Sequence, residues 1–402
     1  MVTLVLIKTI TLFFFSFTFL LSISGFGKFL VSHNYYKQEN FNFFELLIYG
    51  LIFQTIIGFF LYITTGTNEY LNILLLIIGL FLYFFYKKKL NQIQIKHLLL
   101  LLILIFSILL ISKTHEDFIG YHLFSINEIF SNQIRIGVTN LNLRFFHSSL
   151  LAYSQSLFII PYLNFQLIHI PIFLIYFSAL GYFIYTFFTS KKNTERFFSI
   201  VISMILLIKF NRLSEFGYDY ISQFLLLIVF HKIYFHRSDK YQLSKALKIF
   251  IFSILIKPIS LLFLPIPLYL IFRHKIKFLL SIFNINKFTL FLMILILVSS
   301  SFLRTGCLFY PINQTCFDKE KIFWSEKNKV KEYSKYVSLW AKNFYSKEKS
   351  KYVKINDEKV FDKNFNWLKY WIEGHFFYKI SEFLILLISI ILFSLIYFTR
   401  EK

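Results

Sequence analysis

Residues 97–122 have the sequence HLLLLLILIFSILLISKTHEDFIGYH, in which an uncharged apolar run passes directly into a short polar segment. The polar segment places His115, Glu116, Asp117 and His122 at the end of what we expect to be a membrane-spanning helix. Carboxylates at a membrane surface can stay ionised in contact with water while neighbouring side chains bind a lipid-borne substrate. This one stretch therefore predicts both the class of fold and the place of its chemistry.

The whole chain has the composition of a membrane protein. Hydrophobic residues make up 57% of it, with 56 phenylalanines, and the apolar runs are continuous instead of alternating. Inside lipid only helices and closed barrels satisfy the backbone, and continuous runs favour helices. The formal net charge of +22 comes mostly from Lys and Arg in short segments between apolar runs, which is typical of topology signals. Nucleic acid is not expected as a partner, because its binding needs basic residues clustered on a soluble face.

Apolar runs that we expect to cross the membrane recur along the chain. The first run includes Lys8 and is followed by no convincing cleavage site, so we interpret it as a helix and not as a signal peptide. A further apolar block at 244–272 is interrupted by Lys257-Pro258. The predicted spans, the first run included, lie near residues 9–26, 44–64, 70–86, 97–112, 165–189, 197–209, 221–235, 288–303 and 383–399.

Loop charges predict the orientation, because short cytoplasmic loops carry an excess of Lys and Arg. The pattern is self-consistent if residues 148–160 enter the membrane without crossing it and if the block around Lys257-Pro258 is a tight hairpin. This arrangement gives about eleven crossings and places residues 113–147, 210–220 and 304–382 outside. The basic residues counted as inside are Lys87, Lys88, Lys89 and Lys96; Lys191, Lys192 and Arg196; Lys232, Arg237, Lys240, Lys245 and Lys248; and Arg273, Lys275, Lys277 and Lys287.

The outer segment at 113–147 has the periodicity of a helix lying in the headgroup zone. Its apolar residues recur at helical spacing, and its acids are expected on more polar faces. The alternative is an interfacial linker with solvated charges. The apolar positions are Ile119, Leu123, Ile126 and Phe130, and the polar ones are Glu116, Asp117, His122, Ser125 and Glu128.

A second outer constellation at 211–220 contains Arg212, Glu215 and Asp219 just before a predicted span. Asp219 can be a helix cap, which contributes about 1 kcal/mol, or it can join Glu215 and Asp117 in binding a cation, a phosphate-linked sugar or an acceptor hydroxyl. Lys257 is similarly ambiguous. A Lys in an apolar block either extends to the membrane surface or holds a phosphate in a functional cavity.

Residues 304–382 form the largest polar segment, and all four tryptophans lie in it. Val330, Tyr333, Val337, Trp340 and Phe344 follow a three-and-four spacing, which predicts an amphipathic helix between Ser325 and Ser346. The two cysteines, Cys307 and Cys316, both lie here. Exactly two cysteines in a segment predicted to face an oxidising compartment favour a disulfide.

The stretch from Glu116 to Ser149 resembles a family of uncharacterised bacterial polytopic membrane proteins. In that family an acid and a Tyr-His pair, here Tyr121-His122, precede the pattern G-x-x-N-L-x-x-R-x-x-x-x-S-S. Gly137, Asn140, Leu141, Arg144, Ser148 and Ser149 fill that pattern here. Later segments around Asp219, Lys257 and Cys307 are similar to that family's landmarks, so the resemblance covers roughly residues 95–325.

The organisation in turn resembles the GT-C superfamily of integral-membrane glycosyltransferases, which use polyprenyl-phosphate sugars outside the cytoplasmic membrane. That resemblance implies a multi-pass, all-α protein of the bacterial inner membrane with an extracytoplasmic active face. Residues 1–96 would be N-terminal spans and 97–303 a GT-C-like core. Residues 304–382 would be an outer helical segment, and 383–402 a last span with a basic tail. The chain departs from the superfamily in having three spans before the acidic loop and a small outer C-terminal segment.

Sugar transfer with inversion needs a base for the acceptor hydroxyl and positive charge or a metal for the departing phosphate. The resemblance assigns the base to Asp117, with Glu116 and His122 as the next candidates. Substrate binding is assigned to Asp219, Glu215, Arg144, Arg212, Lys257, Tyr121 and His115. The sequence leaves open whether a divalent cation takes part, and the pair His115 and His122 is a weak metal signal.

The expected partners are a polyprenyl-phosphate-linked sugar, membrane lipids and a glycan or lipid acceptor. Two other functions share this substrate class. A transporter or flippase would place ionisable residues on broken helices near the midplane, and the block around Lys257-Pro258 would then be one broken helix. A polymerase or ligase for lipid-linked saccharides fits the same residues.

Overall fold

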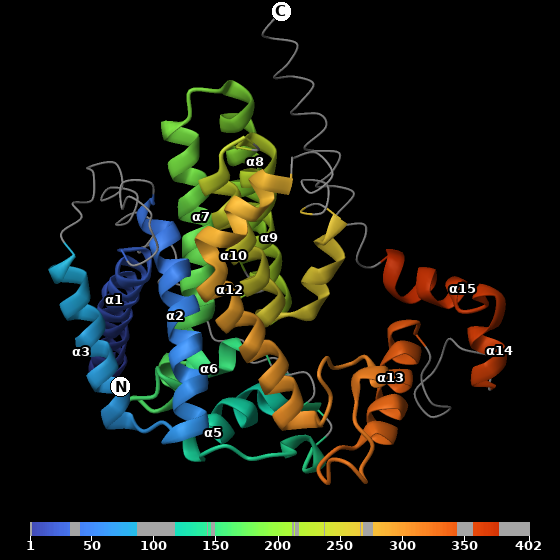
Figure 1. Cartoon of the computed structure of the whole chain (residues 1–402). Coiled ribbons are helices and arrows are strands. Elements are labelled where there is room, and N and C mark those ends of the chain that lie inside the picture. Colours follow the sequence, from blue (N-terminus) through green and yellow to red (C-terminus); the bar gives the residue numbers. More distant parts are fainter. Residues whose placement is uncertain are drawn as a thin grey trace, which may run out of the picture. The chain divides into compact units, whose positions relative to one another are not determined.

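The computed structural model describes residues 2–32, 41–86, 117–142, 144–145, 149–210, 213, 217–236, 238–265, 267, 276–343 and 357–377. Within these residues every regular element is a helix or a helical turn (Figure 1). Among the described residues, four helical segments are long and apolar enough to cross a membrane: Thr9–Ser32, Phe43–Thr64, Phe165–Thr189 and Phe288–Thr305. The all-helical, membrane-type prediction is thereby confirmed. The predicted spans at 97–112 and 383–399 lie outside the described residues.

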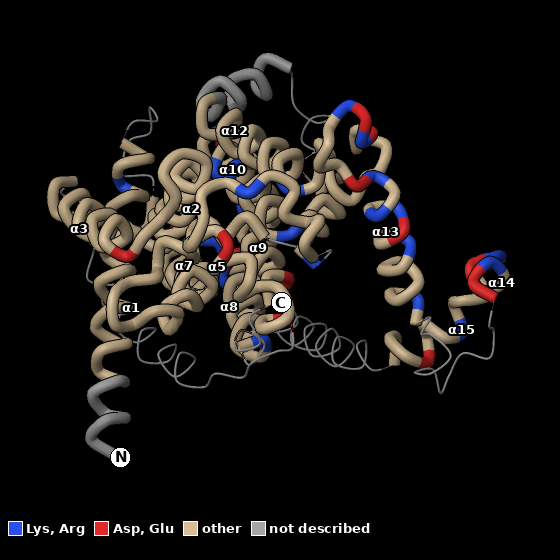
Figure 2. The backbone as a smooth tube through the Cα atoms, turned by 90° about the horizontal axis from the view of Figure 1, so that it is seen from below, with Lys and Arg blue, Asp and Glu red and all other residues tan. Residues whose placement is uncertain are grey.

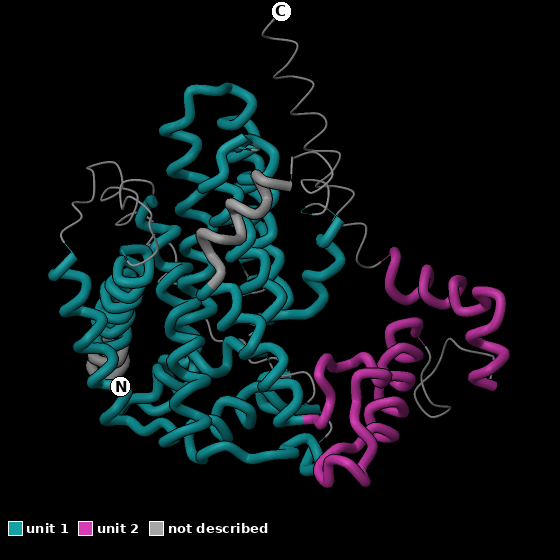
Figure 3. The backbone as a smooth tube through the Cα atoms, in the orientation of Figure 1, with its two compact units in different colours: residues 1–304 teal, residues 305–402 magenta. Residues whose placement is uncertain are grey.

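The chain divides into two compact units, Met1–Arg304 and Thr305–Lys402 (Figure 3). In the first unit, helices α1 (Val2–Ser32), α2 (Phe43–Thr64) and α3 (Glu69–Phe85) pack together, with α1 contacting both of the others. Helix α7 (Ile170–Thr189) packs against α2, α8 (Asn193–Ile208) and α9 (Tyr218–Phe235). Its segment is 89% buried, so other helices surround it where lipid would surround a peripheral span. Helix α10 (Lys240–Ile256) packs on α9.

Glycines let the N-terminal helices approach one another closely. A Cβ atom on Gly25 of α1 would lie 1.9 Å from the carbonyl oxygen of Gly79 in α3. A Cβ on Gly50 of α2 would lie equally close, 1.9 Å, to the carbonyl oxygen of Ile23. Without a hydrophobic driving force in lipid, helix pairs associate through such backbone contacts between small residues. These positions therefore tolerate no side chain.

Two short helices fill the space between the longer ones. Helix α6 (Leu151–Ser156) has six residues, about 9 Å of rise, so it enters the bundle without crossing it. Asn72 of α3 holds the end of this segment, because its Nδ2 donates to the carbonyl oxygens of Ser156 at 2.9 Å and Ile159 at 2.7 Å. Those carbonyls would otherwise be unsatisfied at the helix end.

Helix α5 (Leu123–Ser131) differs from the predicted surface helix. A π-helical turn, Phe118–His122, precedes it and shifts its register. His122, Ser125 and Glu128 are buried, although the sequence placed them on polar faces, because α5 packs against α6 instead of lying free in the headgroups. Ile126 is buried but Ile119 is exposed, so the predicted apolar face coincides only in part with the face that is buried.

The chain turns back at Lys257-Pro258. Helix α10 ends at Ile256, and a 3-10 turn, Pro258–Phe263, follows. The Ser260 hydroxyl donates to the Ser253 carbonyl oxygen at 3.2 Å. In a continuing helix these residues would be separated by about 10 Å of rise. The reversal matches the first arm and the turn of the expected hairpin; residues 268–275 of the second arm lie outside the described residues.

The second unit contains α13 (Lys327–Ala341), α14 (Glu358–Asp362) and α15 (Leu368–Trp371). Figure 2 shows that α13 and α14 carry closely spaced charges of both signs, whereas α1 and α2 are nearly uncharged. Helix α13 lies within the predicted 325–346 helix, and Phe344 is outside the described residues. A disulfide joins Cys307 and Cys316. Val330 is buried, but Trp340 is half exposed, so much of the expected apolar stripe stays open.

Candidate functional site

Several predicted site residues meet where α9 begins. The rings of Tyr121 and His122 lie 4.0 Å apart between centroids, and the His122 ring lies 4.5 Å from that of Tyr218, at right angles to it. Such edge-to-face packing is a favourable aromatic geometry. The π-helical turn carries Tyr121 and His122, whereas Tyr218 is the first residue of α9. Two segments that are distant in the sequence are thereby in direct contact.

Gln155 connects this aromatic group to the buried segment α6. The Tyr218 hydroxyl donates to Gln155 Oε1 at 2.5 Å, and Gln155 Nε2 donates to the Ile168 carbonyl oxygen at 3.0 Å. Both ends of a fully buried amide are thus satisfied, as its burial requires. Sequence reasoning missed Gln155, although a lone amide side chain inside an apolar segment is a usable signal for a polar network.

Asp219 and Lys257 form an ion pair, with Lys257 Nζ 3.2 Å from Asp219 Oδ1. Gly217 is the N-cap residue of α9, and among the residues that the structure describes no side chain makes a capping hydrogen bond there. Asp219 is therefore not the cap that one interpretation of the sequence predicted. Helix α10 ends at Ile256, so Lys257 is its C-cap residue, and the Lys257 side chain is one-quarter exposed. Lys257 therefore lies at the end of an apolar helix and is not buried inside one.

Arg144 lies against the π-helical turn. A Cβ atom on Gly120 would be 2.9 Å from Arg144 Nη1, so the guanidinium rests on the Gly120 backbone. Asp117 is exposed at the start of this same turn. The remaining predicted site residues, His115, Glu116, Arg212 and Glu215, lie outside the described residues. Of the ten predicted residues, the structure describes Asp117, Tyr121, His122, Arg144, Asp219 and Lys257.

Arg304 is a buried cation that sequence reasoning missed. It is 4% exposed, and none of its three side-chain nitrogens has a hydrogen-bond partner. The Tyr153 hydroxyl, which is hydrogen-bonded to Ser300 at 2.9 Å, lies beside the guanidinium. The charge of Arg304 also acts on Glu128 and on Tyr218. The sequence feature that could have indicated Arg304 is its position directly after the apolar run 288–303.

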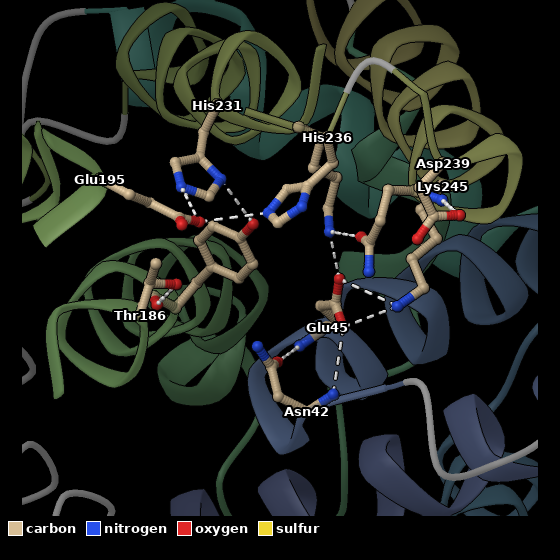
Figure 4. A network of polar contacts seen from close by, with 11 residues as sticks. Asn42, Glu45, Thr186, Glu195, His231, His236, Asp239 and Lys245 are labelled. Carbon is tan, nitrogen blue, oxygen red and sulfur yellow. Dashed lines mark hydrogen bonds and ion pairs between the residues drawn. The ribbon is translucent and has the colours of Figure 1, made fainter. Parts of the chain in front are cut away.

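A second polar group lies near the opposite end of α9. Glu45 accepts hydrogen bonds from Lys232, from Lys245 at 3.1 Å and from the Asn42 backbone N–H at 3.0 Å (Figure 4). Lys232, Lys245 and Lys248 are at most 1% exposed. The sequence pattern predicted all three in a short loop between apolar runs. That interpretation was wrong because α9 and α10 extend through these residues, and Glu45 of α2 compensates the buried charge.

The family model described as "Domain of unknown function (DUF8201)" matches residues 3–402. No curated protein and no solved structure matches the chain.

Proposed function

The chain belongs to the family described as a domain of unknown function (DUF8201), and from its own residues we propose that it is a membrane-embedded glycosyltransferase. It would transfer a sugar from a polyprenyl-phosphate donor to a cell-envelope glycan or lipid acceptor. Its active face would be extracytoplasmic, in a GT-C-like arrangement of about eleven spans.

The observation that carries this proposal is the meeting of Asp219 with Lys257 beside the contact of His122 with Tyr218. Four segments contribute: the π-helical turn, the start of α9, the break after α10 and α6 through Gln155. Carboxylate, imidazole, phenol and ammonium groups at one end of a helix bundle are the groups that a phosphate-linked sugar requires.

Each residue has a defined part in the proposed transfer. The Asp117 carboxylate takes the proton of the acceptor hydroxyl while that oxygen bonds to the anomeric carbon of the sugar. The bond from this carbon to the phosphate oxygen breaks, and the electron pair leaves with the polyprenyl phosphate. Lys257 and Arg144 hold the phosphate as its charge grows. The partly exposed side chain of Lys257 suits this part, because a fully buried one could not exchange Asp219 for a ligand.

The buried Arg304 adds support to the proposal. A buried guanidinium with three unpartnered nitrogens is costly unless an anion or polar ligand completes its hydrogen bonds. Phosphate is well matched to guanidinium geometry. We therefore include Arg304 in the proposed binding of the donor phosphate, with Glu128 as the buried carboxyl that its charge reaches.

The decisive experiment uses the full chain purified in detergent, a polyprenyl-phosphate sugar and a lipid or glycan acceptor. We expect transfer by the wild type and none by D117N. The matched control is D239N, since Asp239 caps α10 through Tyr241 N–H at 2.8 Å and Asn is an equally good cap. Equal transfer by D117N would remove Asp117 as the base.

Detergent also separates the transferase from the transporter. Micelles have no two leaflets, so a flippase would form no product under these conditions, whereas a transferase would. In cells, D117N should lose the surface glycan with normal protein levels in the membrane fraction. Loss of glycan in cells without any transfer in detergent would favour the transporter or the polymerase.

A further inference from the structure

A second candidate site, independent of the proposed transferase, lies at the C-terminal end of α9. Glu195 comes from the first turn of α8, His231 from α9 and His236 from the residue that ends α9. Glu195 Oε1 lies 3.1 Å from His231 Nε2 and 3.1 Å from His236 Nε2. One donor atom from each residue falls within 4.8 Å of the others. Figure 4 shows the three side chains pointing toward one another.

Neighbouring groups fix the orientation of two of these side chains. The Tyr182 hydroxyl is 2.8 Å from His231 Nδ1, and the Ser190 hydroxyl donates to Glu195 Oε2 at 2.6 Å. Arg196 Nε in turn donates to the Ser190 carbonyl oxygen at 2.7 Å. A metal at Nε2 needs the tautomer in which His231 Nδ1–H donates to the Tyr182 hydroxyl oxygen, which leaves the lone pair of Nε2 free. This arrangement is the usual support of a metal ligand.

His231 Nε2 points to a ligand by itself. The residue is 1% exposed, and Nε2 has no hydrogen-bond partner although Glu195 Oε1 is only 3.1 Å away. An unsatisfied nitrogen at this depth is unfavourable, and a cation between Nε2 and the carboxylate, whose Oε1 is also 3.1 Å from His236 Nε2, would satisfy it.

The spacing also fits a particular class of cation. Bonds of about 2.0–2.1 Å to nitrogen and oxygen in tetrahedral geometry put ligand atoms about 3.3 Å apart. Two imidazoles and one carboxylate select zinc-like transition metals over Mg²⁺ or Ca²⁺, which prefer oxygen ligands. Three protein ligands leave one position for water.

We propose that Glu195, His231 and His236 bind one zinc-class divalent cation that fastens the start of α8 to the end of α9. The site is about 20 Å of helical rise from Tyr218 on α9, so it takes no part in the proposed sugar transfer. Glu195 also accepts a hydrogen bond from Ser190, which lies between α7 and α8, so the bound cation would hold these helix ends together.

The test counts metal in the full chain, purified in detergent, stripped with a chelator and dialysed against Zn²⁺. We expect one equivalent in the wild type and in the control H375Q, whose histidine lies in the second unit. E195Q, H231Q and H236Q should each bind at least tenfold more weakly. Replacing Zn²⁺ by Co²⁺ should give ligand-field absorption in the wild type that H236Q lacks.

H236Q is the most informative variant, since its side chain is about one-third exposed and its loss disturbs little packing. If the variants of the buried residues misfold, a measurement on the wild type alone still tests the site. Zn²⁺ should raise its melting temperature by a few degrees, and chelator should reverse the shift. No stoichiometric uptake by the wild type, or equal uptake by E195Q and H236Q, would overturn the site and leave a metal-free cluster of hydrogen bonds.

Discussion

Lys257 Nζ lies 3.2 Å from Asp219 Oδ1, which joins the break after α10 to the first turn of α9. Asp219 is half exposed and Lys257 is one-quarter exposed. A pair of this kind contributes about 0–1 kcal/mol to stability. Its position next to the His122 and Tyr218 contact therefore needs an explanation other than stabilisation.

K257Q should lower sugar transfer at least tenfold while it changes the free energy of unfolding by less than about 1 kcal/mol. The reason is that an ammonium holding a phosphate is needed in the reaction but not in the fold. Transfer rates and denaturant unfolding of the purified protein measure the two effects. K319Q breaks the exposed pair of Lys319 with Glu326 and should change neither. A loss of stability that accounts for the whole loss of transfer would contradict the binding role.

E45Q should destabilise the protein by about 3–5 kcal/mol, because it leaves the buried ammonium groups of Lys232 and Lys245 without their counterion. Thermal or denaturant unfolding in detergent measures the loss. The matched control is E358Q, which breaks an exposed pair with Lys335 and should cost under about 1 kcal/mol. Similar effects of the two substitutions would show that the network around Glu45 is not a buried anchor.

The sequence offered the meeting of Asp219 with Lys257 as one of two interpretations of Lys257, because each residue borders an apolar run. It could not predict the burial of Lys232 and Lys245. Counting Lys as a topology signal assumes that it is solvated, and the compensating acid, Glu45, belongs to a helix far away in the sequence. A local sign existed: Asn42 and Glu45 form the N-x-x-E pattern of a capping box, and the structure contains that box.

Helix α5 shows a second limit of prediction from sequence patterns. Helical spacing correctly indicated a helix near Ile126, but it assumed a uniform register. The π-helical turn at Phe118–His122 has more residues than an α-helical turn, so the side chains that follow it are rotated about the helix axis. Packing against α6 then buries His122 and Glu128. Whether a polar face meets water or protein depends on neighbours that a single helix does not encode. Arg304 was missed for the same reason, since its surroundings come from α5, α6 and α9.

G58A should destabilise the first unit by about 1–3 kcal/mol, as overpacking does. A Cβ on Gly58 would lie 2.2 Å from the Tyr153 carbonyl oxygen, so α6 would have to move away from α2. That shift would also displace Gln155, and sugar transfer should fall along with stability. The control F60A removes an exposed ring of the same helix and should leave transfer intact. Wild-type stability in G58A would show that α6 is loosely held.

E128Q should make the protein more stable than the wild type at neutral pH and little different at acidic pH. Burial raises the pKa of Glu128, and the charges of Arg304 and Arg135 and the hydrogen bond from Tyr62 offset this only in part. With a folded pKa above the unfolded value, the stabilising contribution is complete below the unfolded pKa of about 4.3 and is lost as pH rises through the folded pKa.

The measurement for Glu128 is the unfolding midpoint of both proteins across this pH range, taken as a difference so that other titrating groups cancel. The Tyr62 hydroxyl is 2.9 Å from Glu128 Oε1, and the amide oxygen of Gln can accept the same hydrogen bond. The advantage of E128Q should therefore grow with pH. Parallel profiles of the two proteins would show that the Glu128 carboxyl is not held in its neutral form.

Replacing both cysteines, C307S with C316S, should loosen the start of the second unit. Closing a loop of this length stabilises a folded state by about 2–3 kcal/mol, and two backbone hydrogen bonds flank the bridge, Leu308 N–H to Thr315 O at 3.1 Å and Phe317 N–H to Gly306 O at 3.0 Å. Limited proteolysis should cut the variant faster between residues 305 and 326, whereas S338A, an exposed change on α13, should match the wild type. The wild type should also change its gel mobility on reduction. Identical mobility with and without reductant would mean that the cysteines are not bonded in the cell, and would remove one support for the prediction that residues 304–382 lie outside the cytoplasm.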